Sequence, residues 1–317
     1  MNAMKLTPFC RRAIWGGTRL SAEFGKKSDS PVIAESWELS CHPGGLSTVA
    51  QGIHADRFIR DVLAENPNMA GEKAKAFGDF PMLVKLLDAE TDLSVQVHPG
   101  DDYAREVEQS YGKNEMWYVM DCEPGARIFL GFQHPISRAE YAERIQNNTL
   151  LEVVNAIPVA VGDCYVIPTG MLHALGGGIL VAEVQQSSDI TYRVYDYDRR
   201  ESNGKPRELH IEKALAVTDT ALVPAKSDFP VEMYSGFYRR ALVNWAYFQS
   251  DYYNVWERVS LFADVDSFHH LLCLEGEMSL KEGGETLLLH KGESVLVPAG
   301  AGHYAMEGIG AFLFSKL

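Results

Sequence analysis

The sequence predicts a mainly β protein made of two jelly-roll-like barrels with a few accessory helices. Short apolar segments separated by turn residues fill residues 237–317, which is typical of an all-β unit. A strand-and-turn pattern at residues 162–173 returns at residues 292–303, as expected for two copies of one barrel. Residues 93–98 alternate between polar and β-branched side chains, so one face of that strand is polar. A polar inner face and an apolar outer face suit a small barrel whose lumen holds a site.

The repeat shares more than its turn. In both copies a glycine and an acidic residue precede a strand that ends in proline, glycine and histidine, at His173 and at His303. The second copy has no counterpart of the 93–98 strand with its following glutamate, and carries His269-His270 instead. We therefore expect a catalytic domain at residues 1–230 with helical excursions, and a structural barrel at residues 231–317.

Taken in order, the chain alternates strand patterns with four helical ones. Residues 5–20 read as irregular, and residues 199–229 as a polar connection to the second unit. Helices are predicted at 53–77, 101–110, 137–155 and 211–217 from apolar spacings of three and four, with Ser137 as an N-cap. Strands of the first unit are predicted at 34–42, 82–87, 93–98, 116–120, 127–132, 157–167, 178–185 and 189–197. Strands of the second unit are predicted at 237–248, 253–261, 268–274, 276–281, 285–289, 293–297 and 302–316.

Composition limits the classes of partner. The formal net charge of the 317 residues is −14 and Lys/Arg residues form no cluster, which argues against nucleic acid or an anionic membrane as a partner. An anionic small molecule fits, because a few local cations can outweigh a distant negative surface. No run approaches the roughly 18 apolar residues of a membrane span, and the N-terminal segment lacks a signal-peptide core. The five cysteines form no CxxC pair, so we expect reduced thiols in a cytoplasmic protein, with Cys164 in the core. The oligomeric state stays open.

Two histidines and a carboxylate form a candidate metal site. Gln96 and His98 share the polar face of residues 93–98. A short predicted helix follows, and Glu115 then opens the next strand. The Pro-Thr-Gly turn aims His173 inward. Imidazole nitrogens with carboxylate and amide oxygens suit a divalent metal such as zinc. The alternative is that His98, before a proline, is a hydrogen-bonded turn residue.

Three charged residues in apolar strands complete the candidates. Lys85 interrupts the apolar run 82–87, where a lysine usually snorkels or forms an ion pair, and it also lies just before the candidate metal strand. Glu183 stands within the apolar VAEV segment. Arg193 lies between tyrosines in DITYRVYDY, where it is either a surface stacking residue or part of the site.

The motifs SVQVHP, KNE, PTGMLHAL and DITYR together resemble the type I mannose-6-phosphate isomerases of the cupin superfamily, in the short bacterial form without the large helical insertion. The likeness runs from about Trp15 to Arg193, and the second copy of the repeat extends it to the end of the chain. It implies two cupin barrels, one zinc ion per chain and a sugar-phosphate substrate. The zinc ligands that it implies are Gln96, His98, Glu115 and His173. The catalytic residues that it implies are Arg193, Lys113, Lys85 and Glu183, and the substrate-binding residues are Ser94, Lys85 and Arg193.

The implied reaction interconverts mannose 6-phosphate and fructose 6-phosphate by moving one proton between adjacent carbons through an enediol. Zinc would act as a Lewis acid on the substrate oxygens, and the residues leave the proton-transfer base open. The chain has no P-loop or dinucleotide fingerprint, so side chains must hold the phosphate. Two alternatives remain: a non-catalytic sugar-phosphate-binding cupin, and a 2-His-1-carboxylate iron oxygenase, in which Gln96 as an extra ligand would close the position that oxygen needs.

Overall fold

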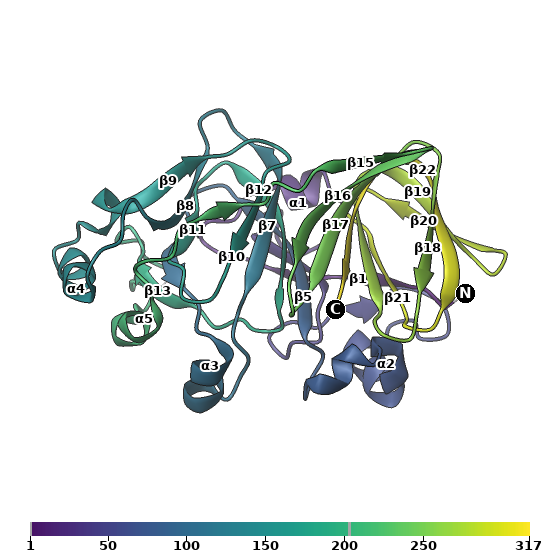
Figure 1. Cartoon of the computed structure of the whole chain (residues 1–317), viewed down its shortest axis with the longest axis horizontal. Helices are drawn as coiled ribbons and strands as arrows, with labels where there is room; N and C mark the ends of the chain where they lie inside the picture. The colour runs from purple at the N-terminus through teal and green to yellow at the C-terminus, as the bar shows by residue number, and fades with distance from the viewer. Residues whose placement is uncertain (1, 202–203) are drawn as a thin grey trace.

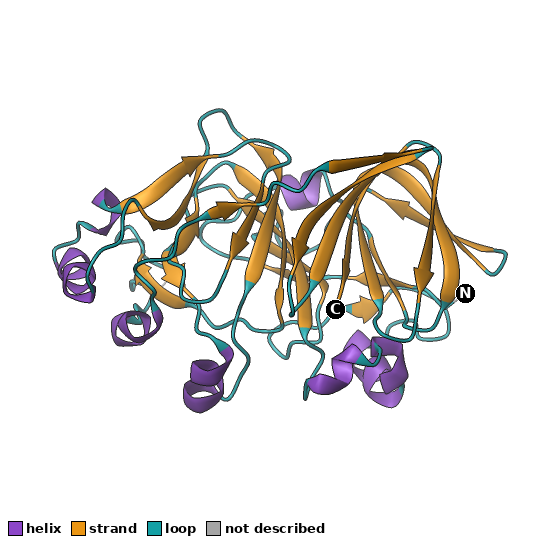
Figure 2. Cartoon of the chain, viewed as in Figure 1, coloured by secondary structure: helices purple, strands orange, loops and turns teal. Residues whose placement is uncertain are grey.

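The computed structural model describes residues 2–201 and 204–317, in two β lobes that lie side by side (Figure 1). Figure 2 shows most of the helices along the lower edge of the two lobes, and α1 (Arg19–Ala22) is drawn between the lobes. The prediction of a mainly β protein with a few helices is confirmed. Residue 1 of the predicted catalytic domain and residues 202–203 of the predicted connection lie outside the described residues. In the described part of the chain, no helix has the length and apolar character needed to cross a membrane.

The elements have the following bounds. The strands up to residue 226 are β1 (Met4–Thr7), β2 (Phe9–Arg11), β3 (Glu35–Leu39), β4 (Thr48–Val49), β5 (Met82–Ala89), β6 (Val95–Val97), β7 (Glu115–Cys122), β8 (Arg127–Phe132), β9 (Val154–Pro158), β10 (Cys164–Ile167), β11 (His173–Leu175), β12 (Ile179–Gln186), β13 (Tyr192–Tyr195) and β14 (Ala225–Lys226). The later strands are β15 (Val231–Tyr234), β16 (Phe237–Asn244), β17 (Gln249–Val255), β18 (Arg258–Ala263), β19 (His269–Glu282), β20 (Glu285–His290), β21 (Ser294–Val297) and β22 (Gly302–Lys316). The α-helices are α1 (Arg19–Ala22), α2 (Ile59–Glu65), α3 (Asp101–Glu108), α4 (Arg138–Gln146) and α5 (Ile211–Val217), and the 3₁₀ helices are Pro67–Ala70, Lys73–Ala76 and Leu150–Glu152.

The first lobe contains two antiparallel sheets. The seven-stranded sheet has the order β14-β10-β7-β12-β5-β3-β2, and the five-stranded sheet has the order β13-β6-β11-β8-β9. Buried apolar side chains from both sheets, such as Trp117, Ile128 and Leu175, form one core cluster. Because the strands β7, β12 and β5 are adjacent in one sheet and β6 and β11 are adjacent in the other, polar residues on these strands come together from distant parts of the sequence.

A ten-stranded sheet forms the second lobe, and it also includes two strands from the beginning of the chain. Strand β1 pairs with β21, with Met4 opposite Leu296, and also with β4. The prediction that residues 5–20 are irregular is therefore wrong for β1, and it is also wrong for β2, which pairs with β3 in the first lobe. Strands of three or four residues are too short to show a periodic pattern, and only their distant partners specify them. The domain division at residue 230 stays a prediction.

Two predicted helices are shorter than expected. Of residues 53–77 only Ile59–Glu65 is α-helical, because Pro67 starts a 3₁₀ turn. The helix capped by Ser137, whose side chain accepts a hydrogen bond from the Glu140 N–H, ends at Gln146 rather than 155. Asn148 then adopts a left-handed conformation with φ 58°, and Val154 begins β9 against Phe132. Tertiary pairing there overrides the apolar spacing that predicted a longer helix.

Two boundaries also change in the second lobe. The predicted strand 253–261 is two strands, because the Trp256 and Glu257 N–H groups donate to the Gly236 carbonyl in a turn between β17 and β18. The predicted strands 268–274 and 276–281 join as β19, with a register shift against β22 between Cys273 and Glu275. Such a bulge bends a strand without ending it.

Candidate metal centre and active-site cavity

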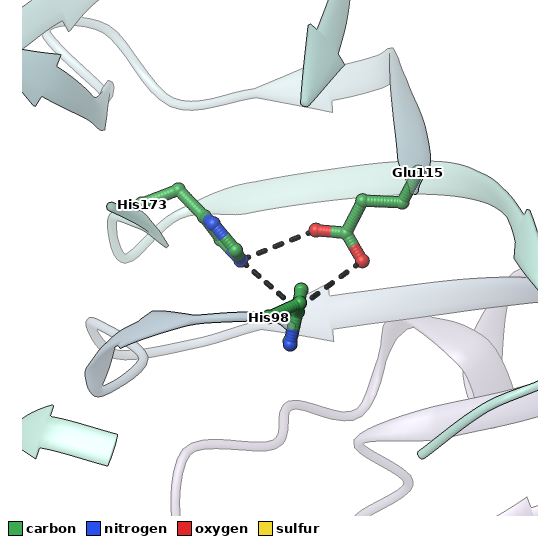
Figure 3. A group of neighbouring side chains, drawn as sticks. All are labelled: His98, Glu115 and His173. Atoms are coloured by element: carbon green, nitrogen blue, oxygen red, sulfur yellow. Dashed lines mark hydrogen bonds and ion pairs between the residues drawn. The ribbon is translucent and has the colours of Figure 1, made fainter. Parts of the chain in front are cut away.

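Two histidines and a glutamate converge from three strands of the first lobe (Figure 3). His98 follows β6, Glu115 opens β7 and His173 opens β11. The His173 Nε2 atom lies 3.1 Å from His98 Nε2 and 3.2 Å from Glu115 Oε1, and His98 Nε2 lies 3.5 Å from Glu115 Oε2. All three side chains are almost completely buried. The structure thus brings together the residues that the sequence proposed from their spacing.

The other ring nitrogen of each histidine is held by the backbone. His98 Nδ1 lies 2.7 Å from the Ile190 carbonyl, and His173 Nδ1 lies 2.8 Å from the Met171 carbonyl. A carbonyl oxygen only accepts, so each Nδ1 carries the proton and each Nε2 presents a lone pair to the site. This arrangement fixes ring orientation as in typical metal sites.

Burial and charge keep these groups in the protonation state that a metal requires. Burial and the nearby Lys113 ammonium lower the pKa of His98 to about 3, and burial lowers the pKa of His173. Burial alone would raise the pKa of Glu115, but the charge of Lys113 and the two imidazoles hold its pKa well below its ordinary value. Two neutral imidazoles and a carboxylate are therefore present at neutral pH.

The buried carboxylate of Glu115 favours a cation. Neither of its oxygens has a hydrogen-bond partner in the described chain, although Lys113 Nζ lies 2.6 Å from Oε2. A buried carboxylate is costly unless it is paired, hydrogen-bonded or bound to a metal. Two imidazoles and a carboxylate form a typical zinc donor set with a free position for substrate. The residues present therefore fit a divalent metal.

Gln96 lies directly beside this group. It is opposite His173 in the pairing of β6 with β11, and its amide Nε2 atom is 3.4 Å from His173 Nε2. Because the amide oxygen and nitrogen can exchange by a rotation of the terminal group, the same position can offer an oxygen to a metal. Ligation by Gln96 stays a prediction.

The metal group adjoins a cavity of about 1070 Å³. Its lining includes all the other residues that the sequence analysis proposed for the site: Lys85, Ser94, Gln96, Lys113, Glu183 and Arg193. Side chains from the two sheets of the first lobe therefore meet at one cavity, and two of its lining residues, Gln96 and Lys113, contact the group of His98, Glu115 and His173.

Two lysines lie among buried carboxylates in this cavity. Lys113 Nζ is 2.6 Å from Glu115 Oε2 and 3.1 Å from His98 Nε2. Lys85 Nζ lies 3.3 Å from Glu183 and 3.5 Å from Glu35. Burial opposes the charge on Lys113, yet the carboxylates of Glu115 and Glu183 raise its pKa. Burial raises the pKa of Glu183 despite the nearby lysines. Lysines and carboxylates at this separation can exchange protons with a bound molecule.

Arg193 and Ser94 lie together on neighbouring strands. The Arg193 Nε–H donates to Ser94 Oγ at 3.2 Å, and its Nη1–H donates to the Glu208 carbonyl at 2.9 Å. Arg207 also lines this part of the cavity, and its guanidinium is bound by the Asp196 carboxylate. Arginines here give the cavity a cationic wall that suits an anionic group.

Some lining residues were missed by the sequence analysis. They are Arg11, Arg12, Glu35, Trp117, Arg207 and His210. Trp117 stands two residues after Glu115 in β7, so the period of two could have placed it on the same face. Glu35 and the arginines carried no such signal. Cys164 is a core residue as predicted: its side chain is almost completely buried and its Sγ atom contacts Met116. This burial raises its thiol pKa to about 12.

The chain is similar to known proteins over its whole length. Residues 3–154 match the family model of the phosphomannose isomerase type I catalytic domain, and residues 239–317 match the mannose-6-phosphate isomerase cupin domain. Mannose-6-phosphate isomerase ManA of Bacillus subtilis is 35% identical over 98% of this chain and 97% of its own length. A putative mannose-6-phosphate isomerase, YvyI, of the same organism is 37% identical over 98% of both. The crystal structure of the mannose 6-phosphate isomerase from Bacillus subtilis has a TM-score of 0.94 at 36% identity, covering 100% of both chains.

Proposed function

The chain belongs to the type I mannose-6-phosphate isomerase family, and from this premise we propose that it interconverts mannose 6-phosphate and fructose 6-phosphate with one zinc ion per chain. The observation that carries the proposal is the buried group of His98, Glu115 and His173 beside a cavity that is lined by lysines, carboxylates and arginines. A sugar-phosphate isomerase needs both parts: an electrophile for the sugar oxygens and a polar wall for the phosphate.

We propose that His98, Glu115 and His173 hold the zinc ion, with Gln96 as the fourth ligand. The fixed Nε2 lone pairs support this assignment, as do the buried Glu115 oxygens, which make no hydrogen bond in the described chain. When bound, zinc supplies Lewis acidity toward the carbonyl and hydroxyl oxygens of the sugar. The side chains around it determine where protons and charge can go.

Proton movement at the sugar is assigned to Lys85, Lys113 and Glu183. Glu183 and Lys85 form a buried pair 3.3 Å apart, and Lys113 lies against the metal group. Burial raises the pKa of Glu183, which makes its carboxyl group a better proton acceptor than an exposed glutamate. An ammonium group beside it can donate to an oxygen on which negative charge develops.

The phosphate end of the substrate is assigned to Arg193 and Ser94. The guanidinium is already oriented by Ser94 Oγ and the Glu208 carbonyl, so little side-chain freedom is lost when an anion binds. Orientation of this kind keeps the reacting carbons over the metal group. On this assignment residues 1–230 act as the catalytic domain, and residues 231–317 as the structural barrel.

A coupled assay tests the proposal directly. Mannose 6-phosphate should be converted to fructose 6-phosphate by the purified protein, and a chelator should abolish the conversion until zinc is returned. Binding of the sugar phosphate without any conversion, with zinc present, would favour a sugar-phosphate-binding protein instead. Oxygen uptake with an iron-loaded sample would favour an oxygenase.

A further inference from the structure

Four side chains lie in a row across the seven-stranded sheet. Trp117 on β7 is opposite Glu183 on β12, Glu183 is opposite Lys85 on β5, and Lys85 is opposite Trp37 on β3. Residues directly opposite each other in antiparallel strands share one face of the sheet and lie close together. The row therefore connects the strand that supplies Glu115 with the Glu183–Lys85 pair.

Trp117 makes a specific contact at each side of its ring. Its indole Nε1–H donates to Glu183 Oε2 at 2.8 Å. The face of the ring lies at 77° to the His173 imidazole, with the ring centroids 5.5 Å apart. Trp117 is 2% exposed and Glu183 is also 2% exposed, so water does not replace this hydrogen bond.

The other oxygen of Glu183 lies beside Lys85, which also lines the cavity. Oε1 makes no hydrogen bond within the described residues and lies 3.3 Å from Lys85 Nζ. With Oε2 bound by the indole, the plane of the carboxylate is fixed and Oε1 is directed toward Lys85. A buried carboxylate without the indole donor could rotate or bind Lys85 through either oxygen.

We propose that Trp117 is a positioning residue for Glu183, whose indole N–H holds one carboxylate oxygen so that the other is presented to Lys85 and the substrate. The proposal rests on the function proposed above, in which Glu183 acts on the sugar. Trp117 follows the candidate ligand Glu115 by two positions in β7. One strand therefore carries both the candidate metal ligand and the N–H donor that orients Glu183.

A double-mutant cycle tests the kinetic part. Trp117→Phe keeps an aromatic ring against His173 and removes only the N–H donor. We expect kcat to fall on the order of tenfold or more with little change in KM, as for loss of a hydrogen bond to a charged group, while the zinc content stays at one per chain. In a Glu183→Gln background the same substitution should change kcat by less than about twofold, because its partner is already altered.

An NMR measurement tests the contact without any turnover. The indole resonance that disappears in Trp117→Phe identifies the Trp117 N–H in the nitrogen-15 spectrum. That resonance should move in Glu183→Gln. It should not move in the control Glu208→Gln, whose exposed side chain lines the same cavity.

Three outcomes would overturn the inference. One is an indole resonance that does not move in Glu183→Gln. The second is a Trp117→Phe protein that turns over like wild type while Glu183→Gln is impaired. The third is a Trp117→Phe effect that adds fully to that of Glu183→Gln, and loss of zinc from Trp117→Phe would likewise contradict the proposed role. A wild-type protein without isomerase activity would instead refute the proposed function, and the NMR result would still decide whether Trp117 holds Glu183.

Discussion

Replacement of Arg193 separates phosphate recognition from metal binding. Its Nε–H donates to Ser94 and its Nη1–H to the Glu208 carbonyl, whereas the rest of the guanidinium lines the cavity. If the phosphate takes two charge-assisted hydrogen bonds from this group, Arg193→Ala removes about 3–6 kcal/mol, at about 1.5–3 kcal/mol for each bond. Since about 1.4 kcal/mol is a factor of ten, kcat/KM should fall by more than about a hundredfold.

Arg193→Lys refines the same prediction. A lysine keeps the positive charge but offers a single ammonium, which cannot contact Ser94, the Glu208 carbonyl and a phosphate in one fork-like arrangement. We expect kcat/KM to stay at least about tenfold below wild type. Arg127→Ala is the matched control, because this exposed arginine opens β8 and stands over the Phe129 ring.

The assay is the coupled conversion of mannose 6-phosphate, measured beside zinc content by elemental analysis. Zinc should stay near one per chain in both Arg193 variants, because the described contacts of Arg193 do not include His98, Glu115 or His173. An Arg193→Ala protein with wild-type kcat/KM would show that Arg193 is only a stacking residue on the cavity wall. A zinc-free variant would show that it supports the metal centre.

Three further predictions address the metal and the second lobe. Chelation should abolish turnover, and zinc should restore it. His98→Ala should lose both metal and activity while the fold is largely kept. Full activity of a metal-free His98→Ala protein would contradict the zinc assignment. His303→Ala should keep one zinc and near-normal turnover, because this side chain is exposed and its described ring contact is with Phe262, at 4.7 Å between ring centroids. His173→Ala should be disabling, and a second zinc that is lost with His303 would contradict this view. His270 is fully buried, neither of its ring nitrogens has a hydrogen bond from the described residues, and burial lowers its pKa to about 3. The unfolded chain therefore binds a proton at this histidine first, and the free energy of unfolding should fall as the pH drops from about 6.5 toward 3. In urea unfolding, the free energy of unfolding of His270→Leu should fall by about 2 kcal/mol less than that of wild type between pH 7 and pH 5. Equal decreases in the two proteins would refute this reasoning.

Much of the candidate site followed from side-chain period and turn chemistry. The period of two put Ser94, Gln96 and His98 on one face; Ser94 and Gln96 line the cavity, and His98 belongs to the adjoining metal group. The Pro-Thr-Gly turn placed His173 at the start of β11, directly beside β6. Strand period and turn chemistry depend only on residues that are neighbours in the chain, so both can be predicted from a single stretch of sequence.

Element limits were less predictable where a distant strand decides them. Residues 4–11 form strands because β1 pairs with β21 and β2 pairs with β3, and neither partner is near in sequence. Val154 leaves the predicted helix because it is opposite Phe132 in the five-stranded sheet. Local apolar spacing cannot report such pairings, since it describes only one side of each contact.

The mainly β class, the repeated strand-and-turn motif and the residue types that could bind a metal follow from the amino-acid pattern. The row of Trp117, Glu183 and Lys85, and the hydrogen bonds of Arg193 to Ser94 and the Glu208 carbonyl, depend on how the strands pack. The period of a strand states which face a side chain takes. The neighbour of that strand and its register are set by the packing of the whole core, which involves contacts between residues far apart in the chain.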